Sequence, residues 1–536
     1  MTVKGGKNKN DIKWTTFKHN GVMFPELYKP HRIPILYDGD EIILEPKSEE
    51  FATIYSKYTG TDYINHKRFK NNFFKDWKKI LKKDGYTQIT DFDKVDFSKI
   101  YNYLLNKKDK SKEEKEKDKE EREKKEKKYK YAYVDGKREE VGNFRIEPAG
   151  LFMGRGCHPL AGKIKRTILP EDITLNIDKE SEIPPLPSFY KNHKWGNIIS
   201  DNTKEWLASW KDNITGKTKY VWLSNQSTFK SKSDQYKFDL AKKLNENIEK
   251  IMNINSINIT NPRTDIKVKQ HAVATYLINK LALRVGNEKG DDEADTVGVC
   301  SLRVEHINLE DDNIIKFDFL GKDSVRYKKN VEVDSDVYSN LIKFVNNKSK
   351  KDYLFDYITT ITLNEYLRNF MEDLSAKVFR TFNSSKLFQD EINKINEKYK
   401  NYKKDDLKDI LKNQYIKANI KVADLCNHQK NVAKSSLEQI KKINEKMKEL
   451  KDKKSKLTDK KKIKKINEKI KILKNKKELK NDMKNLSLGT SQMNYIDPRI
   501  TYAFVKKHKL NIDNFFTKKL QEKFWWAKDV DKHWSF

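Results

Sequence analysis

The order of hydrophobic and polar residues changes several times along the 536-residue chain, and each change predicts a different kind of structure. From about residue 13 to 103, short apolar runs such as 35–37 and 42–44 alternate with turn signals, which predicts mixed strands and helices. Between about 130 and 230, proline and glycine punctuation favours strands. From 235 to 290 the pattern becomes helical, and residues 361–428 read as several further helices.

A β-hairpin is predicted around residue 322. Apolar residues alternate with polar ones from 315 to 319 and again from 325 to 328, a period of two that is typical of strands. The intervening Gly-Lys-Asp-Ser supplies the turn, which places Lys322 at the tip of the hairpin.

Two apolar stripes separated by a polar break stand out in residues 431–480. The first consists of Leu437, Ile440, Met447, Leu450 and Leu457, and the second of Ile463, Ile466, Ile470 and Leu473. Thr458 and Asp459 would form the turn, so we expect an antiparallel coiled-coil hairpin. The same fifty residues hold 20 Lys against 7 acidic residues, a net charge of about +13.

Two other segments cannot bury an apolar face. Residues 107–128 contain no apolar residue, so they form either a helix surrounded by solvent or a disordered segment. Residues 1–11 are mostly polar and contain glycine, so residues 1–12 are expected to form a flexible tail without a secretory signal. Since no apolar run reaches the ~18 residues of a membrane span, we expect no transmembrane segment.

The whole chain carries 112 Lys and Arg against 79 Asp and Glu, a net charge of +33. Such a balance predicts a polyanionic partner, because Lys and Arg neutralise phosphates and release condensed counterions. The alternative is a lysine-rich composition with no specific partner, since 98 of the basic residues are Lys. Each of the 14 Arg therefore deserves separate consideration, because a guanidinium offers phosphate a bidentate fork that an ammonium lacks.

The sequence contains no sign of a bound cofactor. Its three cysteines, Cys157, Cys300 and Cys426, form no CxxC pair, which indicates a reducing intracellular compartment. His-Glu-x-x-His, GxxxxGK[ST] and GxGxxG are all absent, so we expect no metal, nucleotide or dinucleotide cofactor. The acidic cluster 291–295 is interpreted as a solvated turn rather than a metal site. A nucleic-acid enzyme of this kind needs a nucleophile, cations and an acid from its own side chains, and composition does not assign them.

Seven segments resemble one known family. They are NNFFKDW (71–77), RIEPAGLFMGRGCHP (145–159), LALRVGNEKG (281–290), FDFLGKDSVRY (317–327), AKVFRTFNSS (376–385), LCNHQK (425–430) and GTSQMNYIDPRI (489–500). The chain resembles eukaryotic-type DNA topoisomerase I, the type IB enzymes, from about residue 13 to 536. This resemblance implies an enzyme that relaxes positive and negative supercoils through transient single-strand cleavage, strand rotation and religation, without ATP or a required metal.

The resemblance also assigns catalytic residues. Tyr495 would be the nucleophile that forms a 3′-phosphotyrosyl link, and Arg284, Arg380 and His428 would contact the non-bridging phosphate oxygens. Lys322 would protonate the 5′ leaving oxygen. Without the resemblance, Tyr495 is one of 25 tyrosines and Lys322 is an ordinary turn lysine. Independently of the family, the Asp-Pro pair at 497–498 predicts a helix start just after Tyr495.

Further residues match the family's DNA contacts. They are Arg155, His158, Trp206, Lys219, Tyr220, Lys237, Thr296, Asp323, Lys377 and Asn494. Arg155 and Asn494 would flank the cleaved step beside Asp323, where camptothecin-type poisons insert in this family. Sensitivity to such poisons is therefore a hypothesis.

The fold class implied is an α+β multidomain clamp around double-stranded DNA. Its expected parts are a mixed α/β cap (13–205) with a projecting charged helix (107–128), a mainly helical catalytic core with a β-hairpin (206–430), a coiled-coil linker (431–485) and a small helical C-terminal domain (486–536). We expect a monomer with sequence-independent DNA binding, located in the nucleus. A viral replication compartment or virion is the alternative, since the Lys- and Asn-rich composition also suits a large DNA virus.

The chain departs from the family in several places. At most a dozen residues precede the match, where the family usually has a long charged extension, and the linker is expected to be shorter than usual. Met153 and Cys157 stand where Arg and Asn are expected, and Phe382 replaces Tyr. A tyrosine recombinase is one alternative, but those enzymes carry His-x-x-Arg where this chain has Lys377-Val-Phe-Arg380. A non-catalytic DNA-binding protein is the other, although all five catalytic positions are filled.

Overall fold

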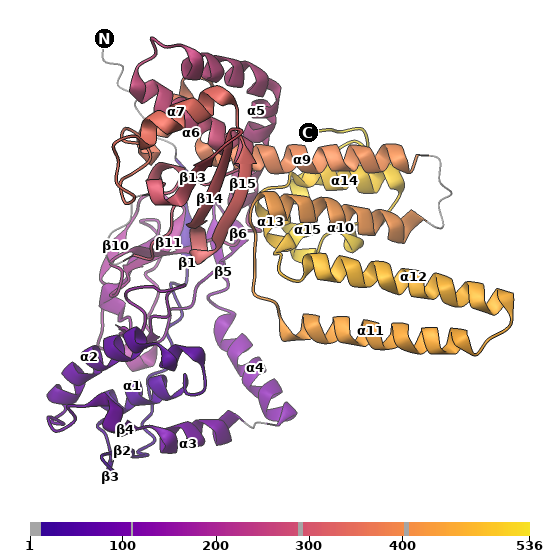
Figure 1. Ribbon diagram of the computed structural model, residues 1–536. Coiled ribbons are helices and arrows are strands. Elements are labelled where there is room, and N and C mark those ends of the chain that lie inside the picture. The colour runs from indigo at the N-terminus through magenta and orange to yellow at the C-terminus, as the bar shows by residue number, and fades with distance from the viewer. Residues whose placement is uncertain (1–11, 109–110, 288–292, 401–406) are drawn as a thin grey trace. The chain divides into compact units, whose positions relative to one another are not determined.

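The computed structural model describes residues 12–108, 111–287, 293–400 and 407–536, and the chain divides into two compact units (Figure 1). The N-terminal unit comprises residues 1–230 with 289–295, and the C-terminal unit comprises 231–288 with 296–536. Most of the expected tail, residues 1–11, lies outside the described residues, as do Asp291 and Asp292. Among the described residues, no helix combines the length and the apolar character needed to cross a bilayer.

The first part of the N-terminal unit is built on aromatic residues. Its elements are β2 (Ile35–Tyr37), β3 (Asp40–Ile42), α1 (Pro46–Ser56), α2 (Lys67–Lys83), β4 (Val95–Asp96) and α3 (Ser98–Lys108), with the sheet order β3-β2-β4. On α2, every fourth residue from Phe69 through Phe73 and Trp77 to Leu81 is buried. This spacing keeps one helix face apolar, which explains why a helix with many lysines packs stably.

The charged segment forms a helix, α4 (Lys112–Glu126). Ser111 and Glu114 close a capping box at its start, which satisfies backbone donors without burying any apolar surface. Arg122 and Glu126 pair one turn apart at 3.7 Å. Of the two possibilities that the sequence left open, the helix surrounded by solvent is therefore the one observed for residues 112–126.

Short antiparallel sheets complete the N-terminal unit, as the punctuated pattern predicts. The strands are β1 (Phe17–His19), β5 (Tyr131–Val134), β6 (Lys137–Glu140), β7 (Gly150–Leu151), β8 (Ile164–Lys165), β9 (Thr174–Asn176), β10 (Asn197–Ile199), β11 (Trp206–Lys211) and β12 (Thr218–Trp222). They form the sheets β1-β5-β6, β7-β8 and β10-β9-β11-β12, in which only the β9–β10 pair is parallel. The β1 and β11 sheets share one apolar core that includes Phe17, Leu175 and Leu207.

The C-terminal unit is mainly helical with one three-stranded sheet. Its elements up to residue 425 are α5 (Thr228–Thr260), α6 (Ile266–Leu281), β13 (Ile307–Glu310), β14 (Ile314–Leu320), β15 (Arg326–Glu332), α7 (Ser335–Val345), α8 (Thr360–Arg368), α9 (Ala376–Lys398) and α10 (Leu407–Leu425). β14 and β15 form the predicted hairpin, with Phe319 opposite Tyr327. Helix α6 is buried along nearly its whole length, so it forms the centre of this unit.

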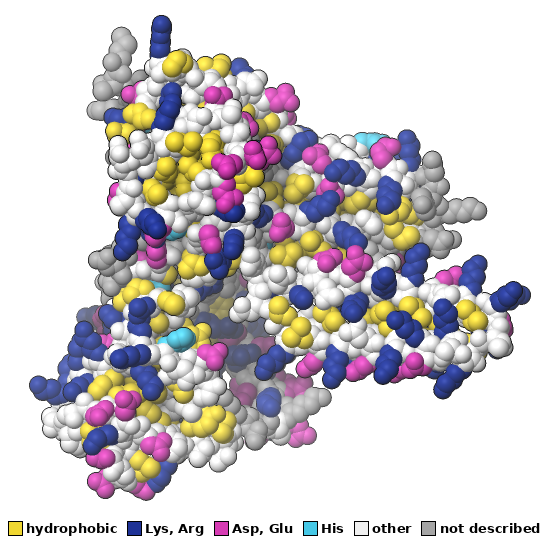
Figure 2. All heavy atoms as spheres, in the orientation of Figure 1, with side chains coloured by type: hydrophobic (Ala, Val, Ile, Leu, Met, Phe, Trp, Pro, Cys, Tyr) yellow, Lys and Arg dark blue, Asp and Glu magenta, His cyan; other side chains and the backbone are white. Residues whose placement is uncertain are grey.

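Two long helices, α11 (Lys434–Ser455) and α12 (Lys460–Met483), form the predicted antiparallel hairpin. Asp459 caps α12 by accepting from two backbone N–H groups, which explains the turn. The stripe residues are mostly half-buried, because each helix is covered by only one partner. Ile443, which the sequence analysis omitted from the first stripe, is the most buried residue of α11. Figure 2 shows Lys and Arg side chains distributed along both helices.

The chain ends in three short helices, α13 (Leu488–Asn494), α14 (Pro498–His508) and α15 (Lys518–Lys523). A small apolar cluster holds this segment against Phe238 of α5, and it includes Phe516, Leu520 and Phe524. The mixed α/β multidomain class is confirmed, whereas the individual domain boundaries stay a prediction.

Candidate active site

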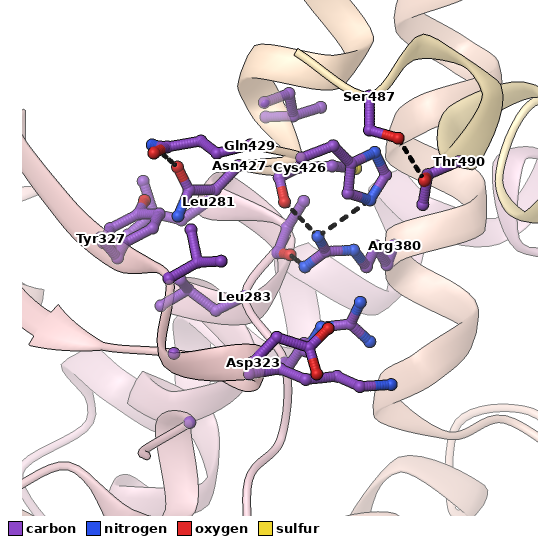
Figure 3. A pocket seen from close by; sticks show the side chains of 18 of the residues that line it. Leu281, Leu283, Asp323, Tyr327, Arg380, Cys426, Asn427, Gln429, Ser487 and Thr490 are labelled. Atoms are coloured by element: carbon purple, nitrogen blue, oxygen red, sulfur yellow. Dashed lines mark hydrogen bonds between the residues drawn. The ribbon is translucent and has the colours of Figure 1, made fainter. Parts of the chain in front are cut away.

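One cavity of about 210 Å³ lies in the C-terminal unit where six segments converge. These are the end of α6, residues 297–298, the β14–β15 turn, α9, the end of α10 and the start of α13. Four of the five predicted catalytic residues line the cavity: Arg284, Lys322, Arg380 and His428. In Figure 3 the Arg380 side chain reaches into it from its helix, with Asp323 of the hairpin turn on one side.

The lining is strongly cationic. Among the described residues that line the cavity, Arg284, Lys322, Arg380 and Lys430 carry positive charge, and Asp323 is the one carboxylate. Positive charge that lacks an equal number of acidic partners in a concave site favours an anion such as phosphate.

The Arg284 backbone is fixed by the segment beyond α6. Ala282 ends the helix in the left-handed conformation with φ 50°, and the N–H of Val299 donates to the Arg284 carbonyl at 2.9 Å. Two residues later, Gly286 has φ +73°, and a Cβ there would lie 2.4 Å from the backbone N of Gly298. A side chain at position 286 would therefore push the backbone segments around Gly286 and Gly298 apart and displace Arg284.

Arg380 is the most enclosed cation of the cavity, with 8% of its surface exposed. Its Nη1 donates to the Ala282 carbonyl at 2.9 Å, and its Nη2 donates to the Cys426 carbonyl. Its Nε is buried and has no hydrogen-bond partner within the part of the chain that the structure describes. Burial lowers the pKa of Arg380, and the neighbouring Arg284 charge lowers it further. A phosphate oxygen would supply both the missing acceptor and the missing negative charge.

His428 follows α10 after Asn427, which adopts a left-handed conformation with φ 51°. Its Nδ1 lies 2.8 Å from the Ser491 hydroxyl, and its Nε2 lies 3.5 Å from Nη2 of Arg380. Burial, together with the charges of Arg380 and Arg284, lowers the pKa of His428 to about 3. The imidazole is therefore neutral near pH 7.

Lys322 occupies the predicted hairpin tip and is exposed. The turn is fixed by a hydrogen bond of 2.8 Å from Gly321 N–H to the Val325 carbonyl. Asn427, next to His428, donates to the Arg326 carbonyl at 3.1 Å. This bond ties the hairpin to the histidine loop, so the lysine stands on a supported turn beside the cavity.

Tyr495 lies next to the cavity, in contact with His428 of the lining. Its ring stacks on the imidazole with centroids 5.2 Å apart and an interplanar angle of 27°. The guanidinium carbons of Arg380 and Arg284 lie 5.2 and 6.0 Å from the centre of the phenol ring. All five predicted catalytic residues therefore lie close together.

A network that the sequence analysis missed holds the tyrosine segment. Ser385 of α9 donates to the Tyr495 carbonyl and accepts from the Asp497 N–H, both at 3.0 Å. Asp497 is fully buried, caps α14 and is paired with Arg499. Arg499 also reaches Asp239 of α5 at 2.6 Å. Burial raises the pKa of Asp497, whereas the hydrogen bonds and the charge of Arg499 lower it, and burial has the larger effect. The Asp-Pro pattern predicted the cap but gave no signal for the partners on α5 and α9.

Comparison with known proteins identifies the family to which this chain belongs. Models of the eukaryotic DNA topoisomerase I DNA-binding fragment, the catalytic core and the C-terminal topoisomerase domain match residues 12–223, 226–461 and 467–536. DNA topoisomerase 1 of Homo sapiens is 40% identical over 98% of this chain and 72% of its own length. The chain belongs to the eukaryotic DNA topoisomerase I family.

Other members of the DNA topoisomerase I family are similarly related. DNA topoisomerase 1 of Candidozyma auris is 38% identical, and the match covers 98% of this chain and 83% of that protein. DNA topoisomerase 1 alpha of Arabidopsis thaliana is 43% identical over 98% of this chain. The chain spans 59% of the length of the Arabidopsis protein.

Five of the predicted DNA contacts lie in the N-terminal unit. The rings of Trp206 on β11 and Tyr220 on β12 have centroids 5.7 Å apart, although the residue paired with Trp206 in the ladder is Trp222, and Lys219 precedes Tyr220. Burial alone would lower the pKa of Lys219, but hydrogen-bonded Glu147 and nearby Asp212 raise it. Arg155 and His158 lie between β7 and β8, where Gly154 packs against His158 so closely that a Cβ at 154 would overlap its ring.

The other five lie in the C-terminal unit. Lys377 is exposed on α9 one turn before Arg380, Asp323 lies in the hairpin turn with φ 67°, and Asn494 precedes Tyr495. Thr296 directly precedes Val297, whose N–H donates to the Leu320 carbonyl at the end of β14. Lys237 shares Asp234 with Lys523 of α15, at 3.1 and 2.5 Å. Burial lowers the pKa of Lys237, and a phosphate beside it would favour its charged form.

The acidic cluster and two of the departures from the family, Phe382 and Cys157, can also be located in the structure. Glu293 of the acidic cluster pairs with Lys217. Within the described ranges, no group of three His, Cys, Asp or Glu side chains is placed to hold a metal. Phe382 is buried in the core of the C-terminal unit. The Cys157 carbonyl accepts a hydrogen bond from Arg68, which supports the Arg155 loop.

Proposed function

We propose that this protein is an ATP-independent type IB DNA topoisomerase that relaxes supercoils of both signs. The observation that carries the proposal is the grouping of a tyrosine, two arginines, a neutral histidine and a lysine around one cationic cavity. This set contains a nucleophile, donors for a charged phosphorane and an acid for the leaving oxygen.

In the proposed reaction, the Tyr495 hydroxyl oxygen attacks the scissile phosphorus and releases its proton to solvent. The new tyrosyl oxygen–phosphorus bond forms as the bond from phosphorus to the 5′ oxygen breaks. Lys322 gives a proton to that oxygen, so the product is a 3′-phosphotyrosine and a free 5′-hydroxyl. Religation is the reverse step, with the 5′-hydroxyl as nucleophile.

Negative charge builds on the non-bridging oxygens as five-coordinate phosphorus forms. Arg284 and Arg380 would donate to these oxygens, and the second is already held by two backbone carbonyls. Because its side chain is largely buried, little reorganisation is needed when the charge appears. A neutral His428 would add one further donor.

The cycle exchanges one phosphodiester for another of similar energy, so ATP is not required. Twist stored in the DNA drives rotation of the free end. We propose that the two units bind the duplex without sequence preference, since phosphate contacts position a protein but do not read bases. The net charge of +33 supports affinity that falls steeply with salt.

The candidate DNA contacts keep their proposed roles. The ring pair of Trp206 and Tyr220, with Lys219, offers a polar and aromatic surface for the backbone of the duplex. Asp323 and Asn494 would lie at the cleaved step together with Arg155, where a camptothecin-type poison could insert. We propose a monomer that acts in the nucleus or, for a viral source, in the replication compartment or virion.

Relaxation of plasmid tests the proposal. We expect positively and negatively supercoiled plasmid without any specific site to be relaxed in EDTA and without ATP. Tyr495→Phe should be inactive yet still bind DNA. Equal behaviour of the two proteins would mean that the chain only binds, and relaxation restricted to a cognate site would indicate a recombinase.

A further inference from the structure

We propose that Ser491 is a positioning residue that controls the tautomer of His428. In the free protein it accepts a hydrogen bond from the imidazole, and when DNA is bound it donates one. The inference rests on the proposed function, because it concerns how His428 becomes a donor to the phosphate.

The imidazole lies between two polar groups. Nδ1 is 2.8 Å from Oγ of Ser491, and Nε2 is 3.5 Å from Nη2 of Arg380. Ser491 is fully buried and His428 is 7% exposed. Solvent therefore has little access to replace the serine hydroxyl as the partner of Nδ1.

The contact with Arg380 determines where the ring proton lies in the free protein. A guanidinium has only donors, so Nε2 must accept from Arg380 and carries no proton. A neutral imidazole has a single N–H, which is then on Nδ1 and donates to the Ser491 hydroxyl. This is the opposite tautomer from the one that can donate Nε2–H to a phosphate oxygen.

A hydroxyl suits this change better than other partners. It can accept from Nδ1–H in the free protein and, after rotating about the Cβ–Oγ bond, donate to bare Nδ1 once Nε2 carries the proton. A backbone carbonyl at the same place accepts only and would hold the ring in the free-state tautomer. Because the contact between Nε2 and Nη2 of Arg380 is long, at 3.5 Å, a phosphate oxygen can replace Arg380 as the partner of Nε2 while the guanidinium stays on its two carbonyls.

The serine also belongs to the segment that carries the nucleophile. Its carbonyl accepts from the Tyr495 N–H at 2.9 Å at the end of α13. The His428 carbonyl accepts from the Ser487 N–H at 2.8 Å at the other end of the same short helix. Docking of α13 therefore brings the nucleophile and the tautomer partner of the histidine to the cavity together.

Single-turnover formation of the covalent adduct tests this role. We expect Ser491→Ala to form the adduct about tenfold more slowly, since one transition-state donor is then poorly oriented, equivalent to about 1.4 kcal/mol. Ser231→Ala is the matched control, because that serine is equally buried in the same unit and its hydroxyl contacts Trp525 at 3.1 Å. The control should react at the rate of the unmodified protein.

A double-mutant cycle separates this role from a structural one. Gln at position 428 keeps an amide donor but has no tautomers. In a His428→Gln background, Ser491→Ala should therefore have no further effect on the rate. A second tenfold loss there would overturn the proposal, as would full activity of Ser491→Ala alone.

The ring proton can also be followed directly by ¹⁵N NMR of histidine-labelled protein. The signal that disappears in His428→Gln should show Nδ1–H in the free protein and Nε2–H in Tyr495→Phe bound to duplex DNA. The same tautomer in both states would overturn the proposal. An enzyme that forms no adduct at all would instead contradict the proposed function, while the free-state spectrum would still report the contact with Ser491.

Discussion

The cavity and the α11–α12 hairpin both concentrate positive charge, but they hold it in opposite ways. In the cavity, the Arg380 fork is 8% exposed and fixed by the carbonyls of Ala282 and Cys426. On the hairpin, residues 431–480 carry 20 Lys, and α12 has no buried residue at all. One region has a few cations in fixed directions, and the other has many cations on flexible stems.

This difference predicts different contributions to function. Charge in a dry, fixed site acts strongly on a single reacting group, because solvent does not screen it. Exposed charge is screened by salt within about 10 Å at 0.1 M ionic strength. The cavity should therefore determine the rate of cleavage, and the hairpin should influence affinity and the rotation of DNA.

The largest expected effect is that of Arg380→Ala. Loss of one fixed donor to a developing oxyanion typically slows a reaction about 10²–10³-fold, and we expect a reduction of this size in the rate of adduct formation on an oligonucleotide. Duplex binding should change much less, because the variant removes one charge from a chain with a net charge of +33.

Arg263→Ala is the matched control for that experiment. Arg263 is an exposed arginine in the loop before α6, in the same unit as Arg380. We expect it to cleave at the rate of the unmodified protein. A comparable loss in both variants would mean that fixed geometry is not what distinguishes the cavity.

A second comparison sets a buried ion pair against an exposed one. Arg499→Ala leaves the fully buried Asp497 without its partner, which typically costs about 3–5 kcal/mol. Lys119→Ala removes the exposed partner of the equally exposed Glu123 on α4, which costs about 0–1 kcal/mol. Hydrogen exchange of the α14 and α4 amides measures both local opening energies. Equal changes in the two helices would contradict the distinction between buried and exposed charge.

The pH dependence of stability gives a somewhat smaller effect. The pKa of His428 is about 3 in the folded protein, compared with about 6.5 when it is unfolded. Between these values the unfolded state binds more protons, so stability falls as the pH drops. From pH 6.5 to 5 this one residue should account for about 1.6 kcal/mol.

His428→Gln removes that contribution, so its unfolding temperature should decrease less between pH 7 and 5 than that of the unmodified protein. His19 provides an internal reference in the N-terminal unit, because burial lowers its pKa to about 4 and the substitution leaves it in place. Parallel pH profiles for the two proteins would show that His428 does not titrate as its surroundings imply.

Periodic patterns predicted the elements of the cavity better than its contacts. The alternation around residues 315–328 gave the β14–β15 hairpin and put Lys322 at its tip, as observed. Local sequence also gave the start of α14, because Asp497 and Pro498 favour a helix N-terminus through short-range bonds.

The contacts within the cavity depend on residues that are distant in sequence. Arg380 meets the Ala282 and Cys426 carbonyls across 98 and 46 residues, and Arg499 meets Asp239 across 260. Periodicity carries no information on such pairs, so they were not predicted. The five catalytic positions came from the family resemblance and not from the pattern, and their roles stay a prediction.

The smallest effect on cleavage is expected from the α12 lysines. We suggest replacing five exposed ones by Gln: Lys461, Lys464, Lys465, Lys469 and Lys471. Adduct formation should change less than about twofold, since no fixed donor is lost, but the log–log salt slope of binding should fall by up to about 0.9 for each lysine that contacts a phosphate. The same five changed to Arg keep the charge and should keep the slope. If the Gln variant retains the original salt dependence and processivity of relaxation, the hairpin does not lie near DNA, and its charge is only a solvated surface.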